Sequence, residues 1–311
     1  MFMMTLACSP WADTENGGYA GAFMQLPVQA RPAAMGGAYF AVSNDAAGQI
    51  FNPAGISAIR TKLFSSSYRA MKLDRKLGFV SVVFPTRLES SLGLSWLYAG
   101  YGEVETRNRS GILTGGTVGQ NEHAFAISFA KLFLPYLSLG TRLNYYYNRL
   151  GDITANSVGI NLGIMLMIDS LFEYGTMDEF PIANLKVGLV LNNLAAKYPW
   201  ESEGAGLAPT QDDEFPKVVG GGFSLTALQE KLLIAGDLEK NFEQNLRARI
   251  GGEYQIDDRF LLRSGLNNGI FTAGAGFRFV LKELALSLDY AFSDDRVDEG
   301  SDHIITFNIF F

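Results

Sequence analysis

Most of the chain after residue 61 alternates between apolar and polar positions with a period of two. In residues 157–168 every even position from Val158 to Ile168 is apolar, whereas the odd positions carry Ser, Gly, Asn and Met. Residues 245–256 and 283–292 repeat the pattern with charged side chains on the second face. A period of two places alternate side chains on opposite faces of a β-strand. The pattern therefore predicts strands with one apolar and one polar face.

About fourteen segments show this alternation, each near the roughly 9 to 11 residues that a tilted membrane strand requires. They cover 62–70, 77–84, 89–101, 121–131, 135–148, 156–168, 184–195, 216–225, 231–239, 245–256, 259–267, 270–280, 283–292 and 302–311. An even count brings both ends of a barrel to one side of the membrane. We predict an all-β fold, a transmembrane antiparallel β-barrel over residues 62–311. The alternation alone leaves a soluble sandwich open as the alternative.

The connections between these segments alternate in length. If the first strand runs outward, the even-numbered connections are periplasmic, and most of them are short, as at 85–87, 132–134 and 257–258. The other set contains the long connections 102–120 and 196–215, which we expect to be extracellular loops. The connection 169–183 is longer than this rule expects.

The last segment ends on the terminal residue with bulky side chains at every second position. One face carries His303, Ile305, Phe307, Ile309 and Phe311. The other carries Thr306 and Asn308. This arrangement resembles the assembly signal of bacterial outer-membrane barrels, with Phe307, Ile309 and Phe311 as the residues that barrel assembly machinery would recognise.

Composition supports a membrane barrel. The 34 Gly, 23 Phe and 13 Tyr residues suit tight turns and aromatic girdles, and only 18% of residues are charged. No apolar run approaches the roughly 18 residues of a membrane helix. The net charge of -7 and the absence of a basic stripe with interleaved aromatics argue against nucleic acid as a partner. We expect a bacterial outer-membrane location, with membrane lipids around the barrel.

Residues 1–12 read like the second half of a secretory signal peptide, with an apolar stretch followed by small residues. The missing basic start suggests translation from further upstream, and we expect cleavage after Ala12. A lipoprotein site at Cys8 is the alternative. Because Cys8 is the single cysteine, we expect no internal disulfide, and two histidines far apart make a zinc site improbable. We predict neither a metal nor a cofactor.

Residues 13–61 do not alternate, and a segment this irregular cannot face lipid. Residues 43–51 have the composition of a short capped helix. The lumen of a barrel with about fourteen strands is wider than its own side chains can fill. We therefore predict that this segment folds into the lumen as a plug or hatch.

The stretch 30–56 also carries a recognisable pattern: a Met-Gly-Gly-Ala block, an acidic-alanine helix and an Asn-Pro-Ala-Gly element. Its central residues are Met35, Gly36, Gly37, Ala38, Asn44, Asp45, Asn52, Pro53 and Gly55. The pattern resembles the start of outer-membrane proteins of the PorV/PorQ family, which are relatives of the FadL long-chain fatty-acid channel. The resemblance implies a fourteen-stranded barrel with an N-terminal hatch.

The resemblance also implies two functions. PorV associates with the type IX secretion system, whereas FadL-like proteins carry hydrophobic molecules. The chain is shorter than typical FadL channels, so we expect a non-enzymatic binding or translocation component of protein secretion that works with secretion-system proteins. The alternative is a FadL-like channel for long-chain fatty acids or other hydrophobic small molecules.

Charged residues on the polar faces of neighbouring strands are further candidates. They are Asp237, Glu239, Arg247, Arg249, Glu253, Arg263, Arg278 and Asp289. Because both signs are mixed, we expect them to pair in the lumen and to anchor the plug. A ring of one sign would have indicated an ion-selective pore.

Three other features give weaker signals. The acidic group Asp294, Asp295, Asp298, Glu299 and Asp302 lacks the spacing of a calcium loop, so a solvated surface is the simpler interpretation. His303 beside Asp302 could suggest an outer-membrane hydrolase, but neither it nor His123 has the neighbours of a catalytic triad. The run 220–222 of three glycines lies within a strand and not before a helix, which favours a close approach of the plug over a phosphate loop.

Overall fold

The computed structural model describes residues 20–108, 110–171, 182–202, 212–242, 245–294 and 300–311. In this part of the chain fifteen strands form one sheet, and fourteen of them close into an antiparallel barrel. The fifteenth strand, β9, pairs with the outer end of β6 and is not part of the closed ring. The barrel strands are β1 (Leu63–Ala70), β2 (Arg75–Thr86), β3 (Ser90–Arg107), β4 (Leu113–Leu134), β5 (Leu137–Leu150), β6 (Ile153–Met167), β7 (Ile182–Leu194), β11 (Val218–Ala227), β12 (Leu232–Asn241), β13 (Leu246–Gln255), β14 (Phe260–Asn267), β15 (Ile270–Leu281), β16 (Leu284–Asp294) and β17 (Ser301–Phe310). The prediction of a fourteen-stranded antiparallel barrel is confirmed.

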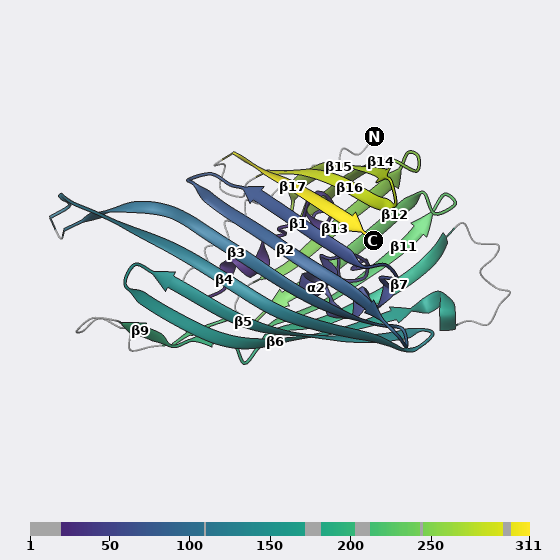
Figure 1. Cartoon of the computed structure of the whole chain (residues 1–311), viewed down its shortest axis with the longest axis horizontal. Coiled ribbons are helices and arrows are strands. Elements are labelled where there is room, and N and C mark those ends of the chain that lie inside the picture. The colour runs from purple at the N-terminus through teal and green to yellow at the C-terminus, as the bar shows by residue number, and fades with distance from the viewer. Residues whose placement is uncertain (1–19, 109, 172–181, 203–211, 243–244, 295–299) are drawn as a thin grey trace, which may run out of the picture.

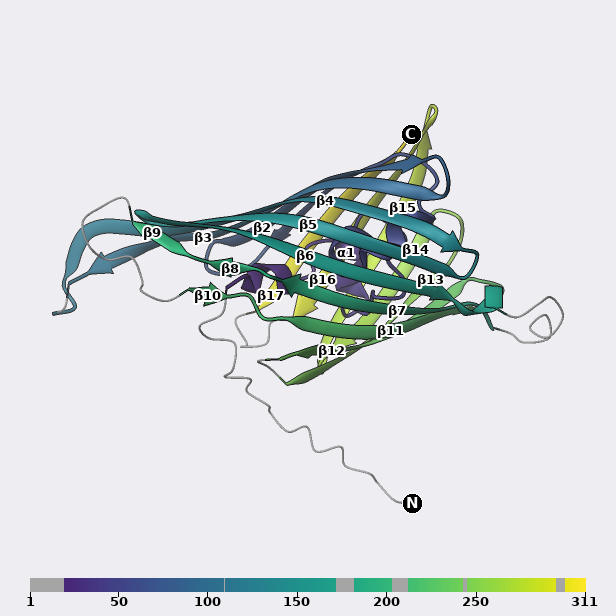
Figure 2. The same cartoon turned by 90° about the horizontal axis from the view of Figure 1, so that it is seen from below.

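The two ends of the chain close the barrel. Strand β1 pairs with β17, with Leu63 opposite Phe310 and Ala70 opposite His303. All other neighbours follow chain order, except that β7 pairs with β11 because the short strands β8 to β10 lie in the connection between them. Figures 1 and 2 show the closed barrel in two views. Since β1 begins beside the end of β17, both lie at the end of the barrel that faces the periplasm.

The connection 102–120 is not the loop that we expected. Most of it extends β3 and β4 into a two-stranded hairpin, with Val104 opposite Val118, and this hairpin reaches far beyond the rest of the barrel in Figure 1. Val and Thr on alternate positions favour a strand, and the many glycines obscured that signal. Gly102, with φ of 64°, lies at one of the irregularities in the register.

The connection between β7 and β11 folds back toward the barrel. It contains β8 (Lys197–Tyr198), β9 (Trp200–Ser202) and β10 (Asp213–Glu214), and β8 pairs with β10. Tyr198 and Phe215 in this connection are buried. On the periplasmic side a short helix η4 (Ile168–Leu171) follows β6. Residues 172–181 of the predicted 169–183 connection lie outside the described residues, as does the predicted leader 1–12 with Cys8.

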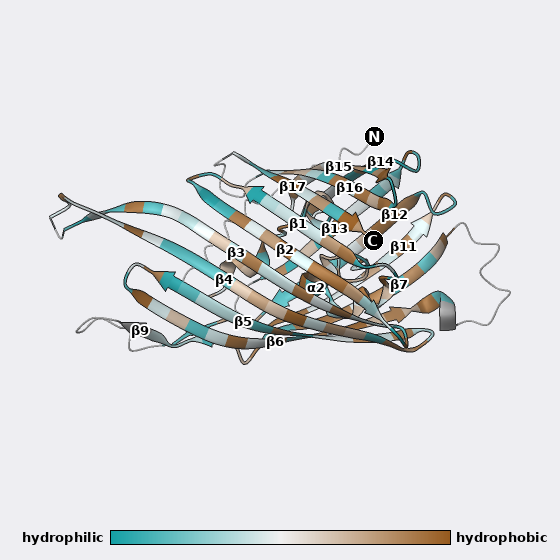
Figure 3. Cartoon of the chain, viewed as in Figure 1, coloured by the Kyte–Doolittle hydropathy of each residue, from teal (hydrophilic) through white to brown (hydrophobic). Residues whose placement is uncertain are grey.

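The outer surface of the barrel is apolar. Leu162, Ile250 and Leu288 are 41%, 52% and 46% exposed, whereas the inward-facing Arg249 and Asp289 are buried. Figure 3 shows brown and teal residues alternating along the strands. A closed barrel that exposes such large aliphatic side chains requires lipid around it. The protein is therefore a β-barrel of the bacterial outer membrane. Separately, none of the helices in the described residues is long and apolar enough to cross a membrane.

Residues 20–61 lie within the outline of the barrel strands in both views (Figures 1 and 2). They form η2 (Ala22–Gln25), α1 (Ala30–Ala34), α2 (Gly48–Phe51) and η3 (Pro53–Ala58). The helix expected over 43–51 begins only at Gly48, because the Asp45 carboxylate accepts the Ala47 backbone N–H and holds a turn. Asn52 caps η3 by accepting the Ala54 N–H, so Asn52-Pro53 starts a 3-10 helix and does not lead directly into β1.

Candidate functional site: the lumen and its plug

The Met-Gly-Gly turn of the plug lies against the backbone of the barrel wall. Gly36 and Gly37 have φ of 64° and 78°, which favours glycine. A Cβ atom on Gly36 would lie 2.7 Å from the Leu266 carbonyl oxygen. On the wall side, a Cβ atom on Gly251 or Gly265 would collide with the Met35 backbone. Glycines on both partners therefore allow this close approach.

A chain of ion pairs joins the plug to three strands. Arg31 of α1 binds Glu253 of β13 through two hydrogen bonds, Nε to Oε2 at 2.8 Å and Nη2 to Oε1 at 2.9 Å. Glu253 Oε2 also accepts Arg263 Nε at 2.6 Å, and Arg263 Nη1 donates to Asp289 Oδ1 at 2.7 Å. Two-pronged contacts of a guanidinium with a carboxylate are among the strongest and most directional side-chain interactions.

Arg31 also organises the plug itself. Its Nη1 donates to Asn44 Oδ1 at 2.7 Å and contacts Asp45 Oδ2 at 3.0 Å. Burial raises the pKa of the Tyr39 phenol, so the hydroxyl stays protonated and donates to Asp45 Oδ2 at 2.5 Å. One arginine thus connects α1, the turn before α2 and the barrel wall. The sequence analysis did not select Arg31, although it lies within the recognised 30–56 stretch.

The next turn of the plug is held by Asp237 on β12. Its Oδ2 accepts the backbone N–H groups of Tyr39 at 2.6 Å and of Phe40 at 2.9 Å. A Cβ atom on Gly188 would collide with the Phe40 carbonyl, and one on Gly220 would collide with the Phe40 ring. The glycine run in β11 thus lies where the plug comes close to the wall.

The remaining hatch residues are buried between plug and wall. Asn52 Nδ2 donates to the Phe40 carbonyl at 2.8 Å and to the Ile164 carbonyl of β6 at 3.0 Å. Pro53 and Gly55 are buried beside it in η3, and a Cβ atom on Gly55 would collide with the Ser43 carbonyl. Ala38 is also fully buried.

The eight selected charges all lie on the lumen side of the barrel. Glu239 pairs with Arg249 at 2.9 Å and lies 3.9 Å from Arg247, while Arg278 is exposed and lines a pocket at the periplasmic end. Their roles in anchoring the plug remain predictions that mutation can test. An additional ion pair, Arg69 with Asp302 at 2.5 Å, joins β1 to β17 and was not foreseen.

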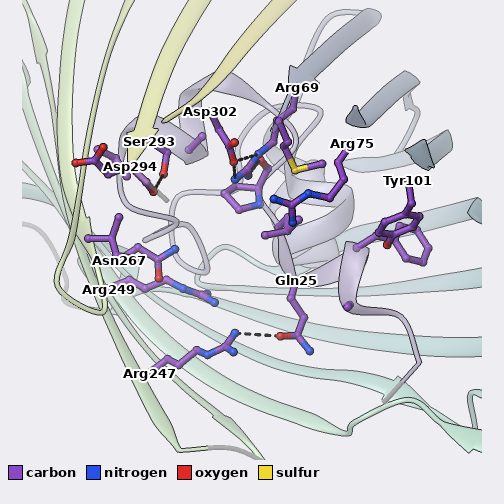
Figure 4. A pocket seen from close by; sticks show the side chains of 18 residues that line it. Gln25, Arg69, Arg75, Tyr101, Arg247, Arg249, Asn267, Ser293, Asp294 and Asp302 are labelled. Atoms are coloured by element: carbon purple, nitrogen blue, oxygen red, sulfur yellow. Dashed lines mark hydrogen bonds and ion pairs between the residues drawn. The ribbon is translucent and has the colours of Figure 1, made fainter. Parts of the chain in front are cut away.

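Above the plug, a pocket of about 280 Å³ opens toward the outer end of the barrel (Figure 4). Residues of η2 and of the segment after it, including Phe23 and Leu26, form one side. The opposite wall carries polar side chains, and in Figure 4 Arg69 contacts Asp302 while Arg247 donates to Gln25 Oε1 at 3.0 Å. The pocket thus combines a polar rim with apolar surface.

Beside this pocket the inner wall of the barrel is apolar. Side chains of β2, β3 and β5 form one buried cluster with residues of the plug and of the β7–β11 connection. Its larger members are Phe23, Val28, Leu77, Phe79, Leu97, Tyr146, Tyr198 and Phe215. Leu26, Met71 and Tyr101 pack against the cluster and also line the pocket. The sequence pattern did not predict this cluster, because the inward-facing positions of the strands were expected to carry polar side chains.

A second large pocket lies at the periplasmic end. It measures about 760 Å³ and is lined by Arg31, Arg263, Arg278, Asp289 and other residues. A small cavity of about 50 Å³ between the two ends shares Gln25, Leu26 and Arg249 with the outer pocket. Residues 20–61 therefore lie between an outer and an inner pocket.

The geometry excludes a catalytic pair of Asp302 and His303, whereas most of the acidic group at 294–302 lies outside the described residues. Asp302 points inward to Arg69, whereas His303 points outward, where its Nδ1 lies 2.7 Å from the Tyr290 hydroxyl. These side chains lie on opposite faces of β17 and cannot form a catalytic pair. Residues 295–299 of the acidic group lie outside the described residues, and among the residues that are described no three His, Cys, Asp or Glu side chains gather around a metal site.

The fold is similar to those of solved outer-membrane transport proteins. The toluene transporter TodX of Pseudomonas putida is 14% identical with a TM-score of 0.58, over 90% of this chain and 96% of that one. The toluene transporter TbuX of Ralstonia pickettii is 11% identical with a TM-score of 0.62, over 91% and 98% of the two chains. A FadL homologue of Pseudomonas aeruginosa is 11% identical with a TM-score of 0.56, over 92% and 98%. No family model and no curated protein matches the chain by sequence.

These likenesses assign the fold: a FadL-like fourteen-stranded barrel that spans nearly the full length of each neighbour. Two of these three neighbours are toluene transporters. The narrower resemblance to PorV/PorQ proteins, drawn from the 30–56 stretch, remains a prediction.

Proposed function

We propose that the protein is an outer-membrane channel that admits small hydrophobic molecules through its plugged lumen. This was the alternative in the sequence analysis, and the fold neighbours favour it over a secretion component. The solved neighbours include transporters of toluene, a single-ring hydrocarbon. The proposal assigns the same class of solute to this chain.

The observation that carries the proposal is the apolar inner wall beside the outer pocket. A water-filled pore has a polar lumen. Here Leu77, Phe79 and Leu97 point inward from β2 and β3 and are about 1% exposed. Phe23 and Tyr198 cover these side chains, so a solute can reach this wall only when the plug shifts, and an apolar wall then favours a hydrophobic molecule over a sugar or an ion. Leu26 and Met71 connect this wall to the pocket.

The size of the outer pocket favours a compact solute. Pockets for drug-sized ligands measure roughly 300–1,000 Å³. The pocket of about 280 Å³ lies just below this range, which suits a single aromatic ring better than an extended fatty acid. The polar rim of arginines and aspartates would remain hydrated while the ring rests against Phe23 and Leu26.

The secretion interpretation makes a different demand on the molecule. It requires the lumen to be a static support and the outer loops to bind partner proteins. The projecting β3–β4 hairpin, with Val104 67% and Ile112 63% exposed, is the surface on which such a partner would act. That interpretation therefore predicts partner capture that depends on the hairpin and a lumen that binds no solute.

Locating a bound solute tests the proposal. Crystals of the protein soaked with 4-iodotoluene should show an anomalous iodine peak in the outer pocket, within contact of Phe23, Leu26 or Met71. Leu26→Arg should abolish the peak by placing a charge on the apolar side. Lys231→Arg, at the far end of the barrel, should leave it unchanged. Absence of any iodine inside the barrel, together with capture of a partner protein by the hairpin, would favour the secretion interpretation instead.

A further inference from the structure

The lipid-facing surface of β2 to β6 carries an aromatic cluster near the outer end of the barrel. The strand register places Tyr98, His123 and Tyr147 side by side in one row. In the row one step nearer the membrane centre, Trp96, Phe125 and Tyr145 are side by side. Elsewhere the outer ends of β13 and β14 turn aliphatic residues such as Leu246, Ile250 and Leu266 outward. Aromatic side chains also face outward near the outer ends of β1, β16 and β17, among them Tyr68, Tyr290 and His303, and the cluster on β3 to β5 is the larger of these two groups.

The rings in this cluster are ordered by specific contacts. Trp96, His123 and Phe125 stack nearly parallel, with centroids 6.0 to 6.2 Å apart and interplanar angles of 6° to 8°. Trp96 Nε1 donates to His123 Nδ1 at 3.2 Å. Because Nδ1 accepts, the proton of the neutral imidazole lies on Nε2. His123 therefore keeps its Nε2–H as a hydrogen-bond donor.

An open apolar hollow of about 560 Å³ begins at this cluster and continues toward the membrane centre. Its outward-facing side chains include Val80, Leu94, Trp96, Ile127, Leu143 and Val158. Ile127, Leu143 and Val158 are 54%, 50% and 60% exposed. A hollow of this composition on a membrane barrel accommodates hydrocarbon chains.

Basic side chains flank the outer edge of the cluster. The register runs from Lys76 on β2 through Gly100 and Asn121 to Arg149 on β5. Three strand spacings separate the two cations, which corresponds to roughly 14 Å between their backbones. Both side chains are exposed, and Arg149 Nε donates to the Gly151 carbonyl at 3.1 Å.

The space between these cations contains the Tyr98 hydroxyl, which donates to Asn121 Oδ1 at 2.7 Å, and no acidic side chain faces it in these rows. A Cβ atom on Gly100 would lie 3.2 Å from Lys76 Cε, so the lysine stem lies across the glycine toward Asn121. The outward positions of β2 to β6 in the four rows from Lys76 down to Val82 carry no Asp or Glu among the described residues. The surface therefore complements a ligand with two separated negative charges.

We propose that this face is a binding site for a phosphorylated, multiply acylated glycolipid of the outer leaflet, of the lipid A class. Its acyl chains fill the hollow, and its sugars lie against Tyr98 and His123, whose amphipathic rings suit the headgroup level. Lys76 and Arg149 bind phosphates at the two ends of the disaccharide. The site lies outside the barrel and is independent of any solute in the lumen.

Native mass spectrometry of the delipidated protein in detergent tests this proposal. Lipid A carrying two phosphates should bind at least tenfold more tightly than phosphatidylethanolamine. The double variant Lys76→Gln/Arg149→Gln should lose that preference, and Trp96→Ala should weaken it. The matched control Lys231→Gln/Lys282→Gln removes two exposed charges at the periplasmic end and should retain it.

Each variant is first checked for heat-modifiable migration, and the two single charge variants carry the test if the double variant does not fold. Equal retention of both lipids by the unmodified protein would overturn the proposal. So would full lipid A preference in the charge variants. A dimer that Trp96→Ala dissociates, with no lipid A preference, would assign the face to a second copy of the chain and would also overturn it.

Discussion

Arg31 in the plug and Glu253 in the barrel wall form a two-pronged ion pair with both nitrogen–oxygen distances below 3 Å, although they are 222 positions apart in the sequence. The Arg31 side chain is 16% exposed and that of Glu253 is 9% exposed. Without Arg31, Arg263 alone would compensate the two buried carboxylates of Glu253 and Asp289, which would leave one net negative charge in the wall. The contact therefore anchors the plug at one identifiable position.

The first prediction concerns this anchor. Arg31→Met should lower the free energy of unfolding by about 3 to 5 kcal/mol, because Glu253 and Asp45 lose their shared cation. Urea unfolding in lipid vesicles measures the change. Arg60→Met, which removes an arginine held only by a 3.3 Å contact to the Ser57 carbonyl, should change stability by less than about 0.5 kcal/mol. Equal effects of the two substitutions would show that the plug is not anchored at Arg31.

The second prediction concerns the lipid face. Leu162→Arg or Leu288→Arg should cost about 2 to 4 kcal/mol if these residues lie near the bilayer midplane. Ser287→Arg should be milder: Ser287 is buried and accepts Asn308 Nδ2 at 2.9 Å, but it lines the inner pocket of about 760 Å³, where the new guanidinium has room beside Asp289. Asn161→Arg, which pattern reasoning also suggests as a mild change, is a poor control because Asn161 is buried and accepts the Asn193 N–H at 3.0 Å. Unfolding in lipid should separate the two faces, and similar costs for Leu288 and Ser287 would contradict the register.

The third prediction concerns assembly. Ile305, Phe307 and Ile309 lie on the outward face of β17, and Phe311 follows that strand and is 52% exposed. Deleting Phe311, or changing Ile309 and Phe311 to Ser, should lower the amount of heat-modifiable protein in the outer membrane. Quantitative blots of membrane fractions give the measure. Unchanged levels in both variants would mean that this strand is not the assembly signal.

The barrel could be predicted from the sequence because its cause is local. Side chains along each strand face lipid and lumen in turn. The alternation within 158–168 and 246–256 is therefore enough to show which side chains face lipid. Most predicted ends agree with the structure to within two or three residues. The exception is the β3–β4 hairpin. There Gly115 and Gly116 interrupt the alternating pattern, although the outer parts of β3 and β4 pair with each other beyond the rest of the barrel.

The contents of the lumen were harder to predict because they depend on contacts between distant residues. Charge patterning identified Glu253, Arg263 and Asp289 but could not show that Arg31 joins them. Likewise, the sequence pattern around Leu77 and Leu97 predicts a strand but does not show that these residues pack against Phe23 in the closed barrel. The apolar cluster therefore depends on barrel closure and on the position of residues 20–61, and neither can be inferred from a short stretch of sequence.

The fourth prediction concerns motion of the plug. Gly37→Val should abolish solute uptake while the barrel still assembles, because φ at Gly37 is 78° and a Cβ atom would lie 3.1 Å from Arg249 Cδ. Gly111→Val is the matched control: φ is also 78°, but nothing lies within 4 Å. The measurement is solute uptake by whole cells that carry equal surface amounts of the Gly37→Val and Gly111→Val variants. Loss of uptake in both variants would point to general backbone strain and not to the plug.

The central claim is that this barrel conducts small hydrophobic molecules, and uptake by the unmodified protein tests it most directly. Cells that lack their own hydrophobic-solute channel and express this protein should take up labelled toluene saturably and several-fold above the empty-vector baseline. A sugar of similar mass should stay at the baseline, since the inner wall is apolar. Toluene uptake that is equal with and without the protein, at matched outer-membrane levels, would contradict the account.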